Sequence, residues 1–457
     1  MRSEFQRDND RLIFSGAFRR LQGKTQVVSP SEADFFRTRL THTIEVGQIS
    51  RRLAELLNEQ ALAAVDSGDT QLAAFCGDRG CIDPDICAAA SSLHDLGHPP
   101  FGHAGEQALV RAVDRLARQW EIGGSLPERA QLTGSFNGNA QSLRMAVCSL
   151  THKPGIDGLE LTRAVLDGTI KYPWSHAEHP ENKGWSVYPT EAEAFEWIRE
   201  GVPDECAGER SLEAELVDFA DDIAYAVHDL EDWYRAGLFP LDQLTQAGSQ
   251  ALARLKDVVA ARWDEGDALE LVEHVFLAPD GGFGAFRSVE FDGVGATVDP
   301  HGVAGREAMR QTRSALYDEC FSTTGIELHP HAAAGWPKRF ALRLRVDPEV
   351  RRKNRLLREL LWIYVVDSHV LATQQNGQRG VVHDLFEIYA DAADPNVDGA
   401  SSMIFPPDVR REIDASEERS VERLRLVTDF VAGMTDDYAI RLHGRLCGGG
   451  SPYPEFI

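Results

Sequence analysis

The sequence lacks any long apolar run. Its 457 residues contain no uninterrupted apolar stretch that approaches about eighteen residues, the length that a membrane-spanning helix requires. The N-terminal segment MRSEFQRDNDRLIFSG also lacks the apolar core of a secretion signal. We therefore expect a protein without membrane segments, located in the cytoplasm.

Basic residues are in deficit. The chain holds 47 lysines and arginines against 72 aspartates and glutamates, which gives a formal net charge of -25. Nucleic acids and anionic membranes are gathered by basic surfaces, so this balance argues against a general binder of either. An anionic substrate would have to be held by a few local cations.

Cysteine spacings typical of zinc knuckles are also missing. The chain has 7 cysteines, an odd number, and Cys76, Cys81 and Cys87 do not follow the C-x2-C pattern. We expect free thiols in a reducing compartment. Hydrophobic residues make up 43% and charged residues 26%, which is ordinary for a globular protein with a large core.

Helical periodicity dominates what is present. In HTIEVGQISRRLAELLNEQ, Ile49, Leu53, Leu56 and Leu57 recur at helical spacing. The alternation in RFALRLRV predicts one short strand, and NRLLRELLWIYVVDSHVLATQ predicts an apolar helix in the core or at a subunit interface. A last long helix is expected over about 418–446. The predicted fold class is all-α, with a few short β-strands.

The densest chemistry lies in SSLHDLGHPPFGHAGEQ, where His94, Asp95, His98, His103 and Glu106 surround a GHPPFGH break. Glycine and proline end one helix here and allow a second to begin, so His98 and His103 can face a substrate. On the second helix His103 and Glu106 stand three residues apart, and a carboxylate beside an imidazole fixes its tautomer for proton donation. The alternative is a helix-capping histidine with a solvated glutamate.

Two further segments supply metal-type ligands. RTRLTH ends in His42, and DFADDIAYAVHD places Asp221, Tyr225 and Asp229 four residues apart on one helical face. Two histidines and two aspartates from separate helices can hold a divalent cation and leave positions open for water and substrate. Mixed nitrogen and oxygen ligation suits manganese, iron or zinc, and suits magnesium less well.

One His-Asp dipeptide alone carries little weight. The chain has three of them: His94-Asp95, His228-Asp229 and His383-Asp384. Each member of the set, taken singly, is also consistent with a core histidine or a surface acid. His94-Asp95 differs from the other two dipeptides because the ligand-type segments described above accompany it.

These segments resemble a known family. RLTH, HDLGHPPFGHAGE, NAQSLR, LTRAVLDGTIKYP, NKGW and ADDIAYAVHDLED are similar to motifs of the HD-domain deoxynucleoside triphosphate triphosphohydrolases, specifically the bacterial dGTPase and dGTPase-like group. The resemblance covers about residues 7–235 and returns more loosely at VTDFVAGMTDDYAIRL. It implies four metal ligands: His42, His94, Asp95 and Asp221. Asp221 is preferred over Asp222 because the family ligand stands four residues before the tyrosine, here Tyr225.

The resemblance also implies the reaction. A divalent metal, manganese or magnesium before iron or zinc, is expected to polarise an α-phosphate oxygen while His103 protonates the departing 5′ oxygen. The products would be a deoxynucleoside and tripolyphosphate, with dGTP as the expected substrate. Glu106 and His98 are the other catalytic residues implied, and His98 would face the phosphates.

Seven substrate-binding residues follow from the same resemblance: Arg39, Lys171, Tyr172, Lys183, Tyr225, Asp229 and Gln22. The three cations would hold the phosphates, although a lysine or arginine taken alone is more often a solvated surface charge. Tyr225 would lie under the deoxyribose or serve as plain core, and Asp229 would lie near the 3′-hydroxyl. One departure is Asn137, because family members commonly carry an acidic residue in the element that reads FNGNAQ here.

The predicted organisation has two parts. Residues 1–240 would form an HD-type metal-dependent phosphohydrolase core with an insertion at about 58–90, and residues 241–457 a helical region that completes the core and an oligomer interface. The family forms homo-oligomers, often hexamers, so assembly is expected. The sequence does not support a single-stranded DNA or nucleotide effector. Two alternatives remain open: another HD-domain phosphohydrolase, either a nucleotidase or a phosphodiesterase, and a non-catalytic nucleotide-sensing helical scaffold.

Overall fold

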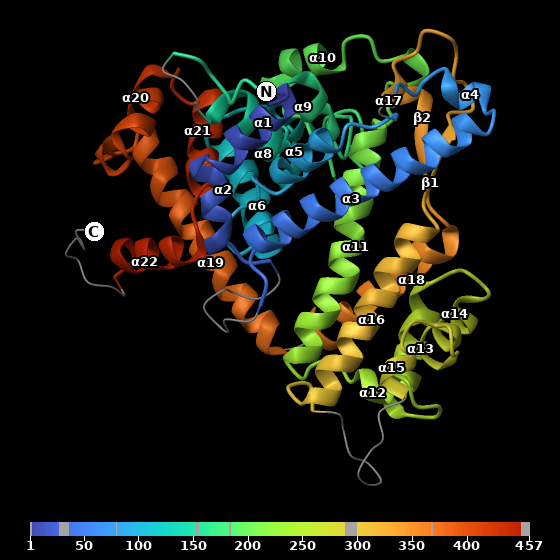
Figure 1. Ribbon diagram of the computed structural model, residues 1–457. Helices are drawn as coiled ribbons and strands as arrows, with labels where there is room; N and C mark the ends of the chain where they lie inside the picture. Colours follow the sequence, from blue (N-terminus) through green and yellow to red (C-terminus); the bar gives the residue numbers. More distant parts are fainter. Residues whose placement is uncertain are drawn as a thin grey trace. The chain divides into compact units, whose positions relative to one another are not determined.

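The computed structural model describes residues 2–26, 36–78, 80–150, 155–181, 184–287, 299–366 and 369–448. Within these ranges the regular structure is helical apart from one two-stranded sheet (Figure 1). The all-α prediction with a few short strands is confirmed. None of the helices in these ranges is long and apolar enough to cross a membrane.

The chain divides into two compact units. Residues 1–218, 328–343 and 374–457 form the first unit, and residues 219–327 and 344–373 form the second. The first unit contains these helices: α1 (Glu4–Ile13), α2 (Gly16–Arg20), the 3-10 helix η1 (Leu21–Gly23), α3 (Arg39–Asp66), α4 (Thr70–Ala73), α5 (Pro84–His94), α6 (His103–Gln119), α7 (Leu126–Thr133), α8 (Gly138–Arg144), the π-helix η2 (Met145–Ser149), α9 (Arg163–Thr169), η3 (Pro189–Glu191), α10 (Ala192–Arg199), η4 (Asp204–Cys206), α17 (Lys338–Ala341), η6 (Ser402–Ile404), α20 (Pro407–Ala415), α21 (Val421–Ala432) and α22 (Asp436–Leu446).

The second unit has fewer elements: α12 (Leu241–Leu244), α13 (Gln250–Arg262), α14 (Ala268–Leu277), α15 (Gly284–Arg287), α16 (Val303–Ser322), α18 (Pro348–Leu361) and the π-helix η5 (Trp362–Val366). Four elements carry the chain from one unit to the other: α11 (Leu212–Arg235), β1 (Gly325–Leu328), β2 (Leu342–Arg345) and α19 (His369–Ala393). The strand expected in RFALRLRV is β2, which pairs with β1.

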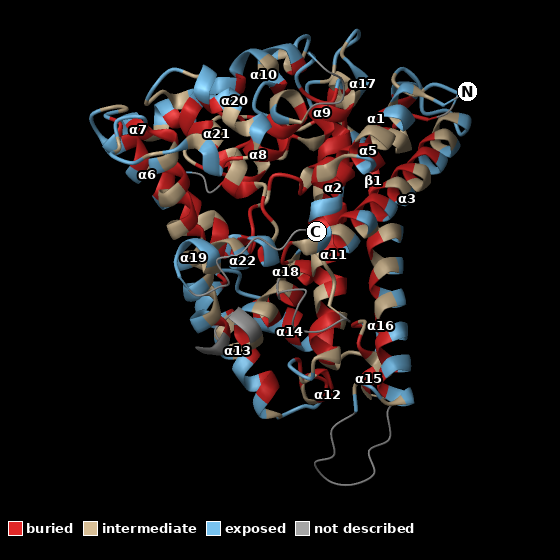
Figure 2. Cartoon of the chain, turned by 90° about the vertical axis from the view of Figure 1, so that its left-hand side faces the viewer, coloured by how far each residue is buried: buried red, intermediate tan, exposed pale blue. Residues whose placement is uncertain are grey.

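Small side chains let α3 and α5 approach each other closely. The sequence ICAAASS of α5 is buried along its whole length, and Figure 2 shows this helix in the buried colour. A Cβ atom placed at Gly47 of α3 would lie 3.9 Å from the backbone oxygen of Ala88. The hydroxyls of Ser50 and Ser91 lie 2.9 Å apart across the same contact. The packing therefore brings together the helix that begins near His42 and the helix that ends at His94.

Helix α6 is fixed by a separate hydrophobic cluster. Leu109, Val113 and Leu116 recur at helical spacing and are buried against Phe386 of α19 and Val427 of α21. The C-terminal helices thus pack on the helix that begins at His103. Because the apolar face of α6 is buried in this cluster, the polar first turn of the helix is held in place.

The helix expected near the C-terminal end is divided in two. The last long helix is wrong as a single element, because α21 ends at Ala432 and α22 begins at Asp436. Thr435 caps the second helix with its hydroxyl, and acidic residues follow in the first turn, so capping outweighs the hydrophobic periodicity. The apolar stretch near 354–372 contains the end of α18, the π-helix η5 and the start of α19, and its residues 367–368 lie outside the described residues.

The free-thiol prediction is wrong for two cysteines. Cys76 and Cys81 form a disulfide, with Cα atoms 4.4 Å apart, while the other five cysteines are free. Gly77 and Gly80 pair across a tight reversal between them, and Gly80 has a φ of 95°, which glycine adopts without strain. This reversal brings together two thiols that sequence spacing did not connect.

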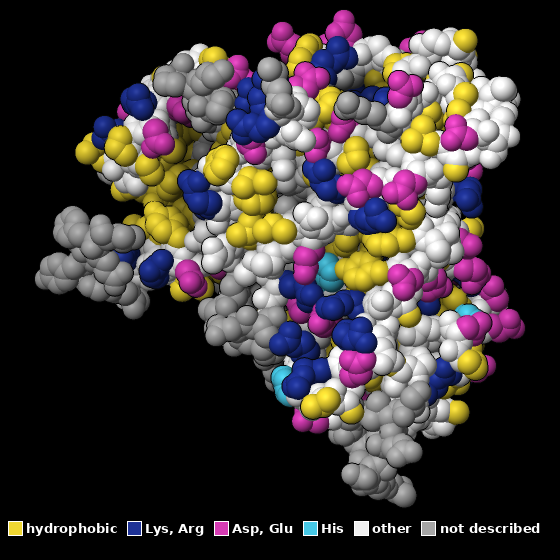
Figure 3. All heavy atoms as spheres, in the orientation of Figure 1, with side chains coloured by type: hydrophobic (Ala, Val, Ile, Leu, Met, Phe, Trp, Pro, Cys, Tyr) yellow, Lys and Arg dark blue, Asp and Glu magenta, His cyan; other side chains and the backbone are white. Residues whose placement is uncertain are grey.

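Acidic and basic side chains are interspersed on the face shown in Figure 3. Several arginines of the second unit pair with carboxylates of the same unit. Arg313 lies 3.0 Å from Glu231, and Arg358 lies 2.7 Å from Asp222. Much of the positive charge is therefore neutralised locally.

Residues near the two ends of the chain meet at a buried lysine. Lys24 is 2% exposed, and its ammonium donates to the backbone oxygens of His98 and Ala432. Next to it, Asp436 accepts hydrogen bonds from the backbone nitrogens of Thr25 (2.9 Å) and Phe101 (2.8 Å). The N-terminal segment, the GHPPFGH break and α22 are tied together at this point.

The burial of Lys24 predicts a pH-dependent stability. Burial lowers the pKa of Lys24 to about 7, whereas an unfolded lysine titrates near 10.4. Between these values the unfolded chain binds more protons than the folded one, so stability gains with rising pH, on the order of 1 kcal/mol per pH unit at most. We expect the free energy of unfolding of the wild type to increase relative to Lys24→Met between pH 7 and pH 10, as measured by urea titration. The exposed Lys338→Met variant is the control, and parallel curves for wild type and Lys24→Met would contradict the prediction.

Candidate functional site

Three residues of the first unit form a candidate metal centre. His42, His94 and Asp95 each offer one ligand atom, and these atoms lie within 4.8 Å of one another. His42 is 2% exposed and Asp95 is 3% exposed, and the two imidazole rings are 5.8 Å apart. Two imidazoles and a carboxylate at this separation suit a divalent cation such as manganese or zinc.

Helix ends position these ligands. Thr38 caps α3 with its hydroxyl, which places His42 at the end of the first turn. His94 is the last residue of α5, and its Nδ1 lies 2.6 Å from the backbone oxygen of Ser91. Because a carbonyl oxygen only accepts, Nδ1 carries the hydrogen and Nε2 carries the lone pair that a metal needs.

Asp95 is held in its ionised form. Burial opposes ionisation, but Arg39, His94 and His98 hold the pKa of Asp95 well below its usual range. Arg39 Nη1 lies 2.8 Å from Asp95 Oδ2, and His98 Nδ1 lies 3.0 Å from Asp95 Oδ1. The family resemblance assigns Arg39 to phosphate binding, but in the structure its guanidinium is paired with this carboxylate.

The expected acid/base pair forms at the start of α6. The backbone turns sharply at Phe101 and Gly102, both with positive φ, and α6 begins at His103. His103 Nδ1 lies 3.5 Å from Glu106 Oε2, and Glu106 Oε1 accepts from the backbone nitrogen of Gly138 at 2.9 Å. Burial opposes ionisation of Glu106, but the hydrogen bond from His103 and nearby charges lower its pKa. An ionised carboxylate therefore lies beside an imidazole whose side chain is 73% exposed.

Asn137 has a structural role in the FNGNAQ element. Its side-chain oxygen accepts from the backbone nitrogen of Asn139 at 2.9 Å and so caps α8. Asparagine is among the preferred N-cap residues, so Asn137 is suited to this structural role. The next residue, Gly138, donates to Glu106, and a Cβ atom there would lie 3.2 Å from the His98 ring.

The other substrate-binding residues expected in the first unit differ in their local contacts. Lys171 Nζ lies 2.7 Å from Asp218 Oδ1, and the ring of Tyr172 lies 5.7 Å from that of Trp174. Gln22 is exposed on η1. Lys183 lies outside the described residues.

Asp221, Tyr225 and Asp229 lie on the part of α11 that belongs to the second unit. Asp221 is 8% exposed. Tyr225 and Asp229 line one cavity of about 220 Å³ in that unit; its remaining lining is Leu230, Phe239, Leu357, Arg358, Leu361 and Trp362. His228 of the second His-Asp dipeptide is buried and bonds to the hydroxyl of Tyr317, which is a structural role.

The residues that hold the backbone of the site in position were not predicted from the sequence. Ser142 donates to the backbone oxygen of His94 at 2.8 Å and accepts from the nitrogen of Gly97 at 2.9 Å. Lys24 and Asp436 hold the backbone of the break at His98 and Phe101. The only signal for Asp436 was its place in VTDFVAGMTDDYAIRL, the looser C-terminal match.

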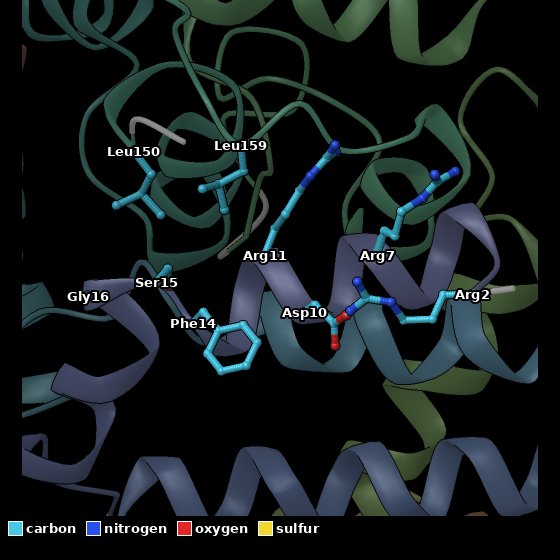
Figure 4. A pocket seen from close by; sticks show the side chains of 9 residues that line it. All are labelled: Arg2, Arg7, Asp10, Arg11, Phe14, Ser15, Gly16, Leu150 and Leu159. Carbon is cyan, nitrogen blue, oxygen red and sulfur yellow. The ribbon is translucent and has the colours of Figure 1, made fainter. Parts of the chain in front are cut away.

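A cavity of about 630 Å³ beside α1 contains none of the expected site residues (Figure 4). It is lined by Arg2, Arg7, Asp10, Arg11, Phe14, Ser15, Gly16, Leu150 and Leu159. Arg2 pairs with Asp10, as Figure 4 shows, and Arg11 lies 3.3 Å from Asp8. The chemistry of the side chains, and not cavity size, identifies the candidate site.

Gly105 offers a test of how α6 meets the break. A Cβ atom there would lie 2.0 Å from the backbone oxygen of Pro100, which cannot move without shifting the turn before His103. We expect Gly105→Ala to lower the free energy of unfolding in urea by about 1–3 kcal/mol. Gly380→Ala is the matched control, because Gly380 is also helical and meets nothing within 4 Å. That variant should be neutral or slightly stabilising, and equal effects of the two substitutions would refute the packing argument.

Comparison with known proteins agrees with this geometry. Residues 39–226 match the family model of the HD domain, and residues 344–445 match that of a phosphohydrolase-associated domain. A deoxyguanosinetriphosphate triphosphohydrolase-like protein of Corynebacterium glutamicum (strain R) is 34% identical over 450 residues, which cover 96% of this chain and 90% of that protein.

Similar proteins occur in other bacteria. A protein of the same name from Streptomyces coelicolor is 34% identical over 469 residues, covering 98% of this chain and 93% of that protein. Another from Brucella anthropi is 33% identical over 450 residues, covering 97% and 89%. With nearly full-length similarity and an HD-domain match that includes the His42, His94 and Asp95 cluster, the chain belongs to the HD-domain hydrolase family that contains the deoxyguanosinetriphosphate triphosphohydrolase-like proteins.

Proposed function

We propose that this protein hydrolyses deoxynucleoside triphosphates, dGTP first among them, to a deoxynucleoside and tripolyphosphate. The proposal rests on one observation: the candidate metal cluster and the candidate acid/base pair lie next to each other along one short segment. His94 and Asp95 of the metal cluster end α5, and the His103–Glu106 pair begins α6 directly after the break. The relatives named as triphosphohydrolase-like proteins support the choice of substrate.

The proposed metal ligands are His42, His94, Asp95 and Asp221. The first three support the proposal by their separation and by the tautomer of His94, while Asp221 enters on its place in the ADDIAYAVHD motif. Manganese or magnesium is the first candidate, and the donor set is also compatible with iron or zinc. A divalent cation bound there supplies Lewis-acid assistance to attack on a phosphoryl group.

His103 is the proposed proton donor to the departing 5′ oxygen. Its imidazole is exposed to an incoming ligand, and the ionised Glu106 lies beside Nδ1 and orients the ring. Glu106 is itself held by the backbone of Gly138, so the pair has little freedom to separate. His98, in contact with Asp95, is proposed to face the phosphates next to the cation.

The substrate contacts are proposed from the sequence pattern. Arg39, Lys171 and Lys183 would hold the phosphates, with Tyr172 and Gln22 contributing to the pocket. Tyr225 and Asp229 would hold the deoxyribose, a role supported by their position on one shared cavity. We propose in addition a homo-oligomer in the cytoplasm, with residues 1–240 as the HD core and residues 241–457 as the completing region; light scattering on the purified protein tests the assembly.

Product analysis is the decisive test. Purified protein is incubated with manganese and each dNTP in turn, and the products are separated by anion exchange. We expect deoxynucleoside and tripolyphosphate, no product after chelation of the metal, and a loss of about 10²- to 10⁴-fold in kcat for His103→Ala. His331→Ala, which removes another exposed histidine, serves as the control.

Two other outcomes would each reject the proposal in favour of a stated alternative. Monophosphate and pyrophosphate would indicate a different HD-domain phosphohydrolase acting on another bond. No turnover of any dNTP with metal present would indicate a nucleotide-sensing scaffold. Wild-type turnover by His103→Ala would leave the reaction intact and remove His103 from its proposed role.

A further inference from the structure

The third His-Asp dipeptide is part of a second cluster of metal-type ligands. His383 and Asp384 lie in the middle of α19, and His443 faces them from α22. Asp384 Oδ1 lies 3.2 Å from His383 Nδ1, and Asp384 Oδ2 lies 2.9 Å from His443 Nε2. Both carboxylate oxygens of Asp384 therefore face imidazole nitrogens.

A thiol completes this cluster. Cys447 is the C-cap of α22, and its backbone nitrogen donates to the oxygen of His443 at 2.8 Å. One helical turn therefore separates the two residues and places them on the same face. One ligand atom each from Asp384, His443 and Cys447 lies within 4.8 Å of the other two, and the thiol is exposed. Carboxylate oxygen, imidazole nitrogen and thiolate sulfur are the ligands that zinc takes in proteins.

A comparison with another cluster in the first unit shows why this one is suited to a cation. Cys206, Glu209 and His329 are also close together. There the backbone nitrogen of His331 donates to His329 Nδ1, so Nε2 carries the hydrogen and donates to Glu209 Oε2 at 3.0 Å. Burial also raises the pKa of the Cys206 thiol to about 11, and Arg343 lies 3.5 Å from Glu209. Both clusters contain a hydrogen bond between an imidazole and a carboxylate, but the Cys206 thiol is buried whereas the Cys447 thiol is exposed to solvent.

We propose that Asp384, His443 and Cys447 bind a thiophilic divalent cation, with zinc as the first candidate. His383 acts as a positioning residue that holds the second oxygen of Asp384, and water fills the fourth position of a tetrahedral site. On binding, the Cys447 thiol loses its proton to solvent, the hydrogen that His443 Nε2 donates to Asp384 moves to Nδ1 through solvent, and the sulfur and Nε2 then bind the cation. This site is distinct from the His42, His94 and Asp95 cluster, which contains no sulfur.

Such a cation would link two helices that both contact the segment around His103. At its other end, α22 contributes Asp436, which accepts from the backbone nitrogen of Phe101. Helix α19 contributes Arg379, which lies 3.5 Å from the side-chain oxygen of Gln107, and Gln107 in turn contacts His103 at 2.9 Å. Figure 1 shows α19 and α22 next to each other in the first unit. The proposed role is to fix α22 against α19.

Cobalt absorption tests the site directly. The full chain, without a polyhistidine tag, is reduced, freed of metal and titrated with Co²⁺ alone. Ligation by sulfur gives a thiolate-to-cobalt charge-transfer band that the sulfur-free cluster at His94 cannot produce. We expect a band that saturates at about one equivalent per chain and is lost when Zn²⁺ displaces the cobalt.

Single substitutions identify the ligands. Cys447→Ser should abolish the band, Asp384→Asn and His443→Ala should weaken cobalt binding severely, and His383→Ala should weaken it by about 10- to 100-fold. The controls Cys206→Ser and His94→Ala should keep the band, as should the double variant Cys76→Ser/Cys81→Ser. Because His94→Ala is expected to remove triphosphohydrolase activity and leave the cobalt band, failure of either proposal is distinguishable from failure of the other.

Hydrogen exchange gives a second readout that does not depend on cobalt. Zinc is expected to slow amide exchange in α22 of the wild type but not in that of Cys447→Ser. A cobalt band of wild-type strength in Cys447→Ser, a band lost in Cys206→Ser, or no band in the wild type would each overturn the proposal. Because Cys447 is exposed after the end of α22, its replacement by serine should leave the fold intact, which circular dichroism checks.

Discussion

A buried carboxylate, Asp95, is the point on which the arrangement of the candidate site depends. A charge that is 3% exposed has lost most of its hydration, and it is stable only when opposite charges and hydrogen bonds replace that hydration. Here the replacement comes from Arg39 on α3, from its neighbour His94 and from His98 in the break after α5. One carboxylate thereby fixes the relative positions of a helix start, a helix end and a turn. The imidazoles of His94 and His98 cannot move far without removing hydrogen-bond or charge partners from this carboxylate.

The break after α5 has an unfavourable backbone conformation. Residues that are distant in the sequence stabilise it. Phe101 takes a positive φ, which a residue with a side chain rarely adopts. The backbone on either side is held by Lys24 and Asp436, from segments more than four hundred residues apart. Because these contacts are buried, they stabilise the turn and so the start of α6 at His103. The acid/base pair is thus local in sequence, whereas its placement depends on both ends of the chain.

Local patterns predicted the parts of the molecule that local forces decide. Helical patterns predicted α3, α6 and α11, and the HDLGHPPFGHAGE segment placed the candidate ligands His94 and Asp95 near the His103–Glu106 pair, as the structure does; the roles of these residues stay predictions. The single helix expected over 418–446 was wrong because Thr435 caps a new helix there. One capping residue outweighs the helical periodicity on both sides of it. The partner of Arg39 and the disulfide at Cys76 could not be predicted, because each depends on how closely two segments approach in three dimensions. Asp221 as a ligand and the division at residue 240 stay predictions.

The charge balance at the site determines how an acidic chain would bind the proposed triphosphate substrate. With a net charge of -25, the chain has no general attraction for phosphate, and the cations expected to bind it are themselves near carboxylates. Arg39 and Asp95 cancel each other, and Lys171 lies beside Asp218. The carboxylate of the His42, His94 and Asp95 cluster is therefore already offset by an arginine. A divalent cation held by His42, His94 and Asp95 would make that region positive, and affinity for a triphosphate would then follow occupancy of the metal centre more closely than it follows any single lysine or arginine.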